Sequence, residues 1–117
     1  MEPAAKVILS TFPPLHCGIA RYAAQHVEYL RRQGATVLTV GLPGSEADVV
    51  VDPCGRRKPL EVLNAVRSLG REPSQCSLAM HWHDGHYFSG GFSERIPTAL
   101  AIGSMLGSFR DSEIICH

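Results

Sequence analysis

The sequence predicts an α/β fold with a mostly parallel sheet flanked by helices, and three observations support this. Short apolar runs alternate with segments of helical periodicity along the whole chain. The first run, made of Val7, Ile8 and Leu9, is uninterrupted and rich in β-branched residues, as is typical of a parallel strand covered on both faces. Glycine and proline mark the boundaries between segments. This alternation favours parallel strands joined through helices over an antiparallel sandwich.

The first βαβ unit has clear start and stop signals. Pro13 and Pro14 end the first strand, because proline has no N–H group to give to a sheet. Apolar side chains then recur at helical spacing from Ile19 to Leu30, and Gly34 ends this helix. The predicted strands of the chain cover residues 6–12, 35–42, 48–52, 76–82 and 112–117, and the predicted helices cover residues 18–33, 59–70 and 94–109.

The later helices are predicted from weaker signals. Pro59 fits the first turn of the second helix, where a missing N–H group costs nothing. Ser93 is the expected N-cap of the third helix. Gly103 and Gly107 lower its helix propensity, so we expect close packing at both positions. Together the elements predict one Rossmann-like domain over residues 1–117.

Composition limits the classes of partner and compartment. Eleven basic and eleven acidic side chains cancel, so nucleic acid and anionic membrane surfaces are not expected partners. No apolar run is long enough to span a bilayer and no signal peptide is visible, which predicts a cytoplasmic protein without a transmembrane segment. Four widely spaced cysteines predict reduced, mostly buried thiols.

The loop before the first helix is the first segment that could carry chemistry. Cys17 and Gly18 stand where the free N–H groups and the dipole of a helix N-terminus attract phosphate, and Gly18 would let a ligand approach the backbone. The alternative is a proline-terminated strand followed by a glycine that only turns the chain.

A histidine-rich segment is the second segment that could carry chemistry. His81, His83, Asp84 and His86 resemble the H-x-H-x-D-H zinc motif of metallo-β-lactamase-type hydrolases. Asp84 stands one position early for that motif, so we expect no bound metal. The alternative to a metal site is a set of structural histidines held by hydrogen bonds.

His117 is the third candidate for a chemical role, and it stands at the carboxyl end of the last predicted strand. In open α/β sheets, ligands bind outside the carboxyl ends of the strands, so Gly18, His81, His83 and His117 are expected along one edge of the sheet. The alternative for His117 alone is an exposed terminal residue without a role.

These residues together resemble a known family. The segment from Val7 to Arg21, a strand that runs into His81-Trp-His-Asp84, and a strand ending in Ile-Ile-Cys-His117 resemble the N-terminal domain of family-four, GT-B-fold retaining glycosyltransferases. The resemblance implies transfer of a sugar from a nucleotide-diphosphate sugar to a hydroxyl acceptor, with no other cofactor. It also implies a role for each segment: Cys17 and Gly18 near the donor diphosphate, His117 as the catalytic residue facing the sugar, and His81, His83 and Asp84 on the acceptor side.

The same resemblance implies a missing partner domain. In this family a C-terminal Rossmann-like domain carries most of the nucleotide site and a paired-glutamate motif, so residues 1–117 would be an incomplete acceptor-side domain that is inactive alone. The lack of a covering helix after the last strand agrees with a fragment. Two alternatives stay open: a metal-dependent hydrolase that uses His81, His83 and His86, and a noncatalytic flavodoxin-like binding module.

Overall fold

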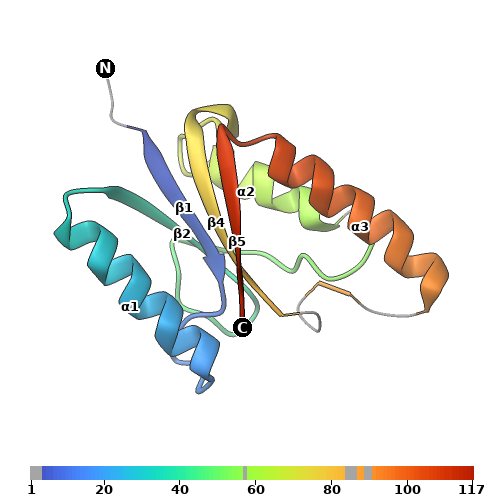
Figure 1. Ribbon diagram of the computed structural model, residues 1–117, viewed down its shortest axis with the longest axis horizontal. Coiled ribbons are helices and arrows are strands. Elements are labelled where there is room, and N and C mark those ends of the chain that lie inside the picture. Colours follow the sequence, from blue (N-terminus) through green and yellow to red (C-terminus); the bar gives the residue numbers. More distant parts are fainter. Residues whose placement is uncertain (1–3, 57, 84–86, 89–90) are drawn as a thin grey trace.

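The computed structural model describes residues 4–56, 58–83, 87–88 and 91–117 of the chain, and over these residues it contains five β-strands in one sheet and three α-helices (Figure 1). The strands are β1 (Ala5–Ser10), β2 (Thr36–Gly41), β3 (Val49–Val50), β4 (Cys76–Trp82) and β5 (Asp111–Cys116), and the helices are α1 (Gly18–Arg32), α2 (Glu61–Ser68) and α3 (Phe92–Gly107). Short 3₁₀ turns over Lys58–Leu60 and Pro73–Gln75 precede α2 and β4. The predicted α/β class is confirmed.

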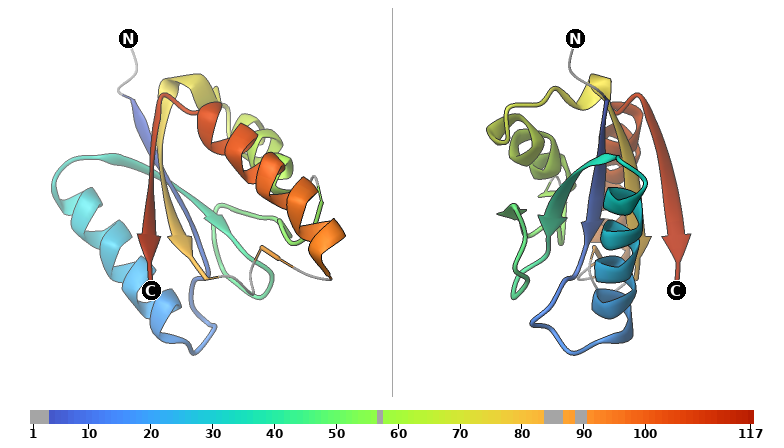
Figure 2. Two further views of the ribbon diagram at one scale, coloured as in Figure 1. Left: turned by 45° about the vertical axis from the view of Figure 1, so that its right-hand side comes forward. Right: turned by 90° about the vertical axis from the view of Figure 1, so that its left-hand side faces the viewer.

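The sheet has the order β3-β2-β1-β4-β5, and every neighbouring pair is parallel. Its central strand, β1, pairs through Val7 with Leu38 of β2 and with Leu78 of β4. Helix α1 covers one face, and α2 and α3 cover the other (Figures 1 and 2). Because all strands run the same way, their carboxyl ends meet at a single edge, where the loop before α1 also lies.

Each face of the sheet has its own apolar core, which explains the uninterrupted apolar runs. In β1, Val7 and Leu9 point towards α2 and α3, whereas Ile8 points towards α1. The core on the α2 and α3 side includes Val62, Val66, Leu78, Met80, Ile102 and Met105. The core on the α1 side includes Phe12, Ala23, Val27, Val37 and Ala79.

Strand β3 is shorter than predicted because a side chain takes over part of its pairing. The Asp48 carboxylate accepts hydrogen bonds from the backbone N–H of Thr39 at 2.8 Å and from its hydroxyl at 3.1 Å. The N–H group of Asp48 donates to the same hydroxyl at 2.9 Å. Regular pairing with β2 is therefore limited to Val49 and Val50 at the edge of the sheet.

Helix α3 differs from the prediction at its start and in its packing. It begins at Phe92 and its N-cap is Gly91 rather than Ser93, since the carbonyl of Gly91 accepts the N–H groups of Glu94 and Arg95. The predicted close packing at Gly103 and Gly107 is wrong: a Cβ added at either position would meet nothing within 4 Å. Both glycines lie on the exposed side of the helix.

The prediction of mostly buried thiols is also wrong. Cys76 is buried, but Cys17 and Cys116 are exposed and Cys54 is partly exposed. Cys17 is exposed because it caps α1 at the carboxyl edge, and Cys116 because it lies in the edge strand β5. Within the part of the chain that the structure describes, none of the helices combines the length and apolar character needed to cross a membrane.

Candidate functional site

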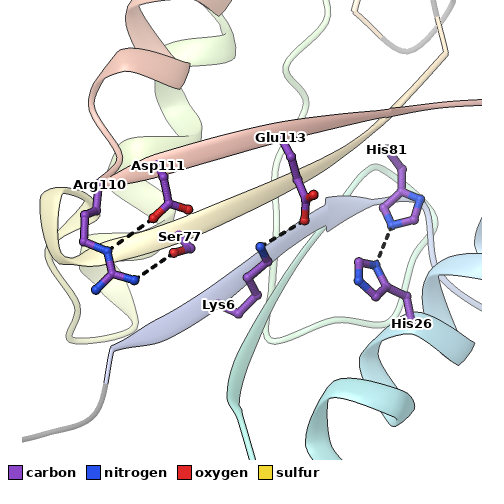
Figure 3. A network of polar contacts seen from close by, with 7 residues as sticks. All are labelled: Lys6, His26, Ser77, His81, Arg110, Asp111 and Glu113. Carbon is purple, nitrogen blue, oxygen red and sulfur yellow. Dashed lines mark hydrogen bonds and ion pairs between the residues drawn. The ribbon is translucent and has the colours of Figure 1, made fainter. Parts of the chain in front are cut away.

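Three imidazole rings from three elements meet near the carboxyl edge of the sheet, on the α1 side. His81 lies in β4, His117 directly follows β5, and His26 lies in α1. His81 Nε2 is 3.2 Å from His26 Nδ1, and His81 Nδ1 is 2.8 Å from His117 Nε2. His81 therefore bridges the other two with both of its ring nitrogens, and Figure 3 shows its contact with His26. We call these three residues the imidazole chain.

Local structure explains why the rings meet. Alternation along β4 turns Ala79 and His81 to the α1 face, and His81 pairs with Ile115 of β5, two residues before His117. On α1, His26 follows Tyr22 by four residues, so both side chains lie on one face of the helix. A parallel register and a helical repeat thus deliver four rings to one place.

Tyr22 packs against the imidazole chain without a hydrogen bond to it. Its ring centroid lies 5.6 Å from that of His81 and 5.2 Å from that of His117, with edge-on geometry in both cases. The rings of His81 and His117 are stacked at 5.1 Å with an interplanar angle of 16°. The exposed side chain of His117 is therefore held by two aromatic contacts in addition to its hydrogen bond.

Burial keeps the middle of the imidazole chain neutral. His81 is fully buried, and this desolvation, with smaller contributions from His26 and His117, lowers its pKa from the ordinary 6.5 to about 4. Partial burial also lowers the pKa of His26. Glu113 opposes both pKa shifts, and it is itself paired with Lys6 at 3.0 Å (Figure 3).

The α1 side of the sheet carries more polar groups towards the other end of β5. Arg110 donates to Ser77 of β4 at 3.1 Å and lies 3.3 Å from Asp111 (Figure 3). With the Lys6–Glu113 pair, these contacts join β1, β4 and β5 through charges rather than through an apolar core. This part of the sheet face is therefore polar where α1 does not cover it.

The loop before α1 brings Cys17 and Gly18 to the same edge of the sheet. The Cys17 thiol caps the helix by accepting the Ala20 N–H at 3.3 Å, and its contact with the Thr11 hydroxyl at 3.5 Å lowers its pKa. A Cβ on Gly18 would meet nothing within 4 Å, so the backbone there is open to an approaching group. A hollow of about 250 Å³ adjoins the loop and is lined by Pro14, His16, Cys17 and Arg21 among others.

The described histidines do not form a metal site. A single ion needs one nitrogen from each ligand directed at a common point, but His81 turns its two nitrogens towards different partners. Among the residues that the structure describes, no three His, Cys, Asp or Glu side chains are arranged to hold a metal ion. His83 is exposed just beyond β4, and Asp84 and His86 lie outside the described residues.

We expect the purified chain to carry no stoichiometric zinc, because a metal bound to His81 would have to displace one of its two hydrogen bonds, and no three described ligands converge on one point. Elemental analysis after dialysis tests this. A ratio near one zinc per chain that is lost in the double variant His81→Ala, His83→Ala would contradict the prediction and favour a hydrolase. A ratio that is unchanged in that variant would mean that the metal binds elsewhere.

The structure brings together only some of the residues predicted from the sequence. His81 and His117 are in direct contact, and Gly18 begins the helix whose next turn carries Tyr22 to both of them. Neither His26 nor Tyr22 was predicted as a site residue, because both fall at the helical spacing of the apolar face that starts at Ile19. Their spacing of four residues was the only signal that could have linked them.

No protein-family model, curated protein or solved structure matches this chain.

Proposed function

We propose that the chain is the acceptor-side, N-terminal domain of a GT-B-fold retaining glycosyltransferase of family four. The observation that supports this most is the meeting of the first turns of α1 with the ends of β4 and β5, through Tyr22, His81 and His117. The reaction would move a sugar from a nucleotide-diphosphate sugar to a hydroxyl group with retention at the anomeric carbon. No cofactor besides the donor substrate is required.

Each end of this region supplies a different function in the proposal. The N-terminus of α1 offers a positive dipole end, and its first turn has no acidic residue to repel a diphosphate. His117 is exposed and would face the transferred sugar. His81 is fully buried, so it would support His117, while the exposed His83 stands on the acceptor side. Asp84 belongs to the same proposed acceptor side but lies outside the described residues.

The donor nucleotide would be held mainly by a second Rossmann-like domain that this chain does not contain. Donor groups positioned around the departing diphosphate would stabilise its charge, which is the main source of catalysis in transfers of this type. We therefore expect a weak donor site and no turnover in the 117-residue chain. The cytoplasm, where nucleotide sugars are made, is the proposed compartment.

Neither alternative function is favoured by a specific observation. A metal-dependent hydrolase would need His81 to direct a nitrogen at an ion, and both of its nitrogens face other imidazoles. A flavodoxin-like binding module needs only the fold, which many unrelated functions share.

We expect UDP-glucose and GDP-mannose to bind with dissociation constants weaker than about 1 mM and to undergo no transfer. In ¹⁵N-edited NMR spectra, the changes in backbone amide chemical shift on adding either sugar nucleotide should concentrate at Gly18 and its neighbours. Gly18→Asp should abolish these shifts by charge repulsion, whereas the fold should tolerate it, because the position is open and acidic groups stabilise a helix N-terminus.

The uncharged variant Gly18→Ala is the matched control. It adds the same Cβ without the charge, so it should weaken the shifts less than Gly18→Asp does. Turnover by the chain alone would contradict the need for a second domain. Shifts that survive in Gly18→Asp would contradict the assigned donor loop.

A further inference from the structure

We propose that His26 is a positioning residue that acts on His117 through His81, so that the imidazole chain accepts only one added proton. The coupling follows from the hydrogen bonds alone, and its consequence for sugar transfer rests on the proposed function. None of the sequence patterns assigned a role to His26.

Neutral His81 can share only one proton with its two neighbours. A neutral imidazole has one N–H group and one lone pair, so His81 donates to one neighbour and accepts from the other. If His26 is protonated, its Nδ1–H donates to His81 Nε2, and His81 Nδ1–H must then donate to His117 Nε2. If His117 is protonated, all of these directions reverse.

Both ends cannot be protonated while both hydrogen bonds persist. Two cationic neighbours would direct an N–H group at each nitrogen of His81, and the single N–H of neutral His81 would oppose one of them. One contact, either the 2.8 Å or the 3.2 Å pair, would have to break. Protonation of His26 and protonation of His117 are therefore mutually exclusive while both hydrogen bonds of the imidazole chain are intact.

The same geometry connects the two outer nitrogens. A proton that arrives at His117 Nδ1 allows the Nε2 proton of His117 to pass to His81 Nδ1, and the Nε2 proton of His81 to pass to His26 Nδ1. A proton then leaves from His26 Nε2. One proton enters and one leaves, and no bond other than N–H forms or breaks.

Burial of His81 leaves the added proton at an end of the imidazole chain rather than in the middle. His81 is fully buried, whereas His26 is partly buried and His117 is exposed. Among the residues that the structure describes, the groups that face the imidazole chain are Tyr22 from α1, Lys6 from β1 and Glu113 from β5. Lys6 and Glu113 pair with each other at 3.0 Å, so neither of these two charges is a dedicated counter-ion for an end of the imidazole chain.

This coupling decides what His117 presents to the edge of the sheet. When His26 is protonated, His117 Nδ1 carries a proton and is a donor. When all three imidazoles are neutral and His81 donates to His26, His117 Nδ1 is a lone pair that accepts. In the proposed glycosyltransferase, His26 would thus select whether the sugar site contains a hydrogen-bond donor or an acceptor.

Imidazole ¹⁵N NMR of the chain between pH 8 and pH 5 tests the coupling without any sugar nucleotide. The protonated fractions of His26 and His117 should sum to at most one over this range. In His26→Phe, which cannot be protonated, His117 should reach full protonation at a higher pH than in the unmodified chain. A summed fraction of two by pH 5, or an unchanged His117 curve in the variant, would overturn the proposal.

Three further variants serve as controls. His26→Gln keeps a polar side chain that cannot ionise, and it should release His117 in the same way if His26→Phe perturbs folding. His16→Gln, an exposed histidine outside the imidazole chain, should leave the His117 curve unchanged. Extending the chain by Gly-Gly-Ser moves the terminal carboxylate away from His117 and should preserve the exclusion. Because no nucleotide sugar is present, failure here leaves the proposed function standing, and the reverse also holds.

Discussion

Acidification from pH 7 to pH 4 is expected to lower the free energy of unfolding by roughly 3 kcal/mol through His81 alone. The cause is the difference in proton affinity between the two states. In the folded chain, burial lowers the pKa of His81 to about 4, whereas the ordinary value of 6.5 applies when the chain is unfolded. Below pH 6.5 the unfolded state therefore binds more protons than the folded state.

The direction of the effect follows from that difference. The contribution of His81 to stability is fully present above pH 6.5. It is lost as the pH falls from 6.5 towards 4, where His81 of the folded chain also begins to protonate. The pKa of His26 is lowered as well, so its contribution has the same sign.

Urea denaturation at pH 7 and at pH 4 measures this loss as a difference in the free energy of unfolding. His81→Phe fills the buried volume without a titrating group, so the difference between the two pH values should shrink by most of the expected 3 kcal/mol or so. His16→Gln removes an exposed histidine and should leave the difference unchanged. All three proteins contain the same carboxylates, and an unchanged difference in His81→Phe would contradict the assignment to His81.

Local sequence patterns predicted most of the fold because each of them is decided by a few neighbouring residues. The apolar run of Val7, Ile8 and Leu9 identified a strand buried on both faces, and both cores confirm it. Two differences from the prediction arose where a side chain makes a contact that no local pattern indicates. Asp48 bonds to Thr39 and shortens β3, and the Cys17 thiol takes a capping role that serine or aspartate usually fills.

The site was predictable only to the level of topology. Parallel strands place His81 and His117 at one edge, which the alternation of segments already implied. Their direct contact depends on the register that pairs His81 with Ile115, and register between distant strands is not encoded in any local pattern. The participation of His26 depends further on the rotation of α1 over the sheet, which small residues such as Ala23 permit.

The imidazole chain and the larger apolar core lie on opposite faces of the same strand. In β4, His81 faces α1, whereas Leu78 and Met80 face α2 and α3. Changes to the core should therefore alter the stability of the chain without altering the hydrogen bonds of His81, provided that the protein stays folded.

Leu78→Ala should lower the free energy of unfolding by roughly 3 kcal/mol, since Leu78 is fully buried in the strand beside β1 and its truncation leaves a cavity. The same truncation at Leu100, which is 69% exposed on α3, should change it by less than about 0.5 kcal/mol. Urea denaturation at pH 7 compares the two variants. Equal losses would contradict the burial that the structure assigns to Leu78.

The two large effects should add, because they act on opposite faces of the sheet and share no hydrogen bond. Leu78→Ala should stay folded at pH 7, where imidazole NMR should still detect the hydrogen bonds of His81. At pH 4 it should lose the further 3 kcal/mol or so of His81 protonation and approach or pass its unfolding midpoint, since a domain of this size has only about 5 to 15 kcal/mol in total. Loss of the His81 signals at pH 7, while the rest of the spectrum stays folded, would show instead that the core and the imidazole chain are coupled through β4.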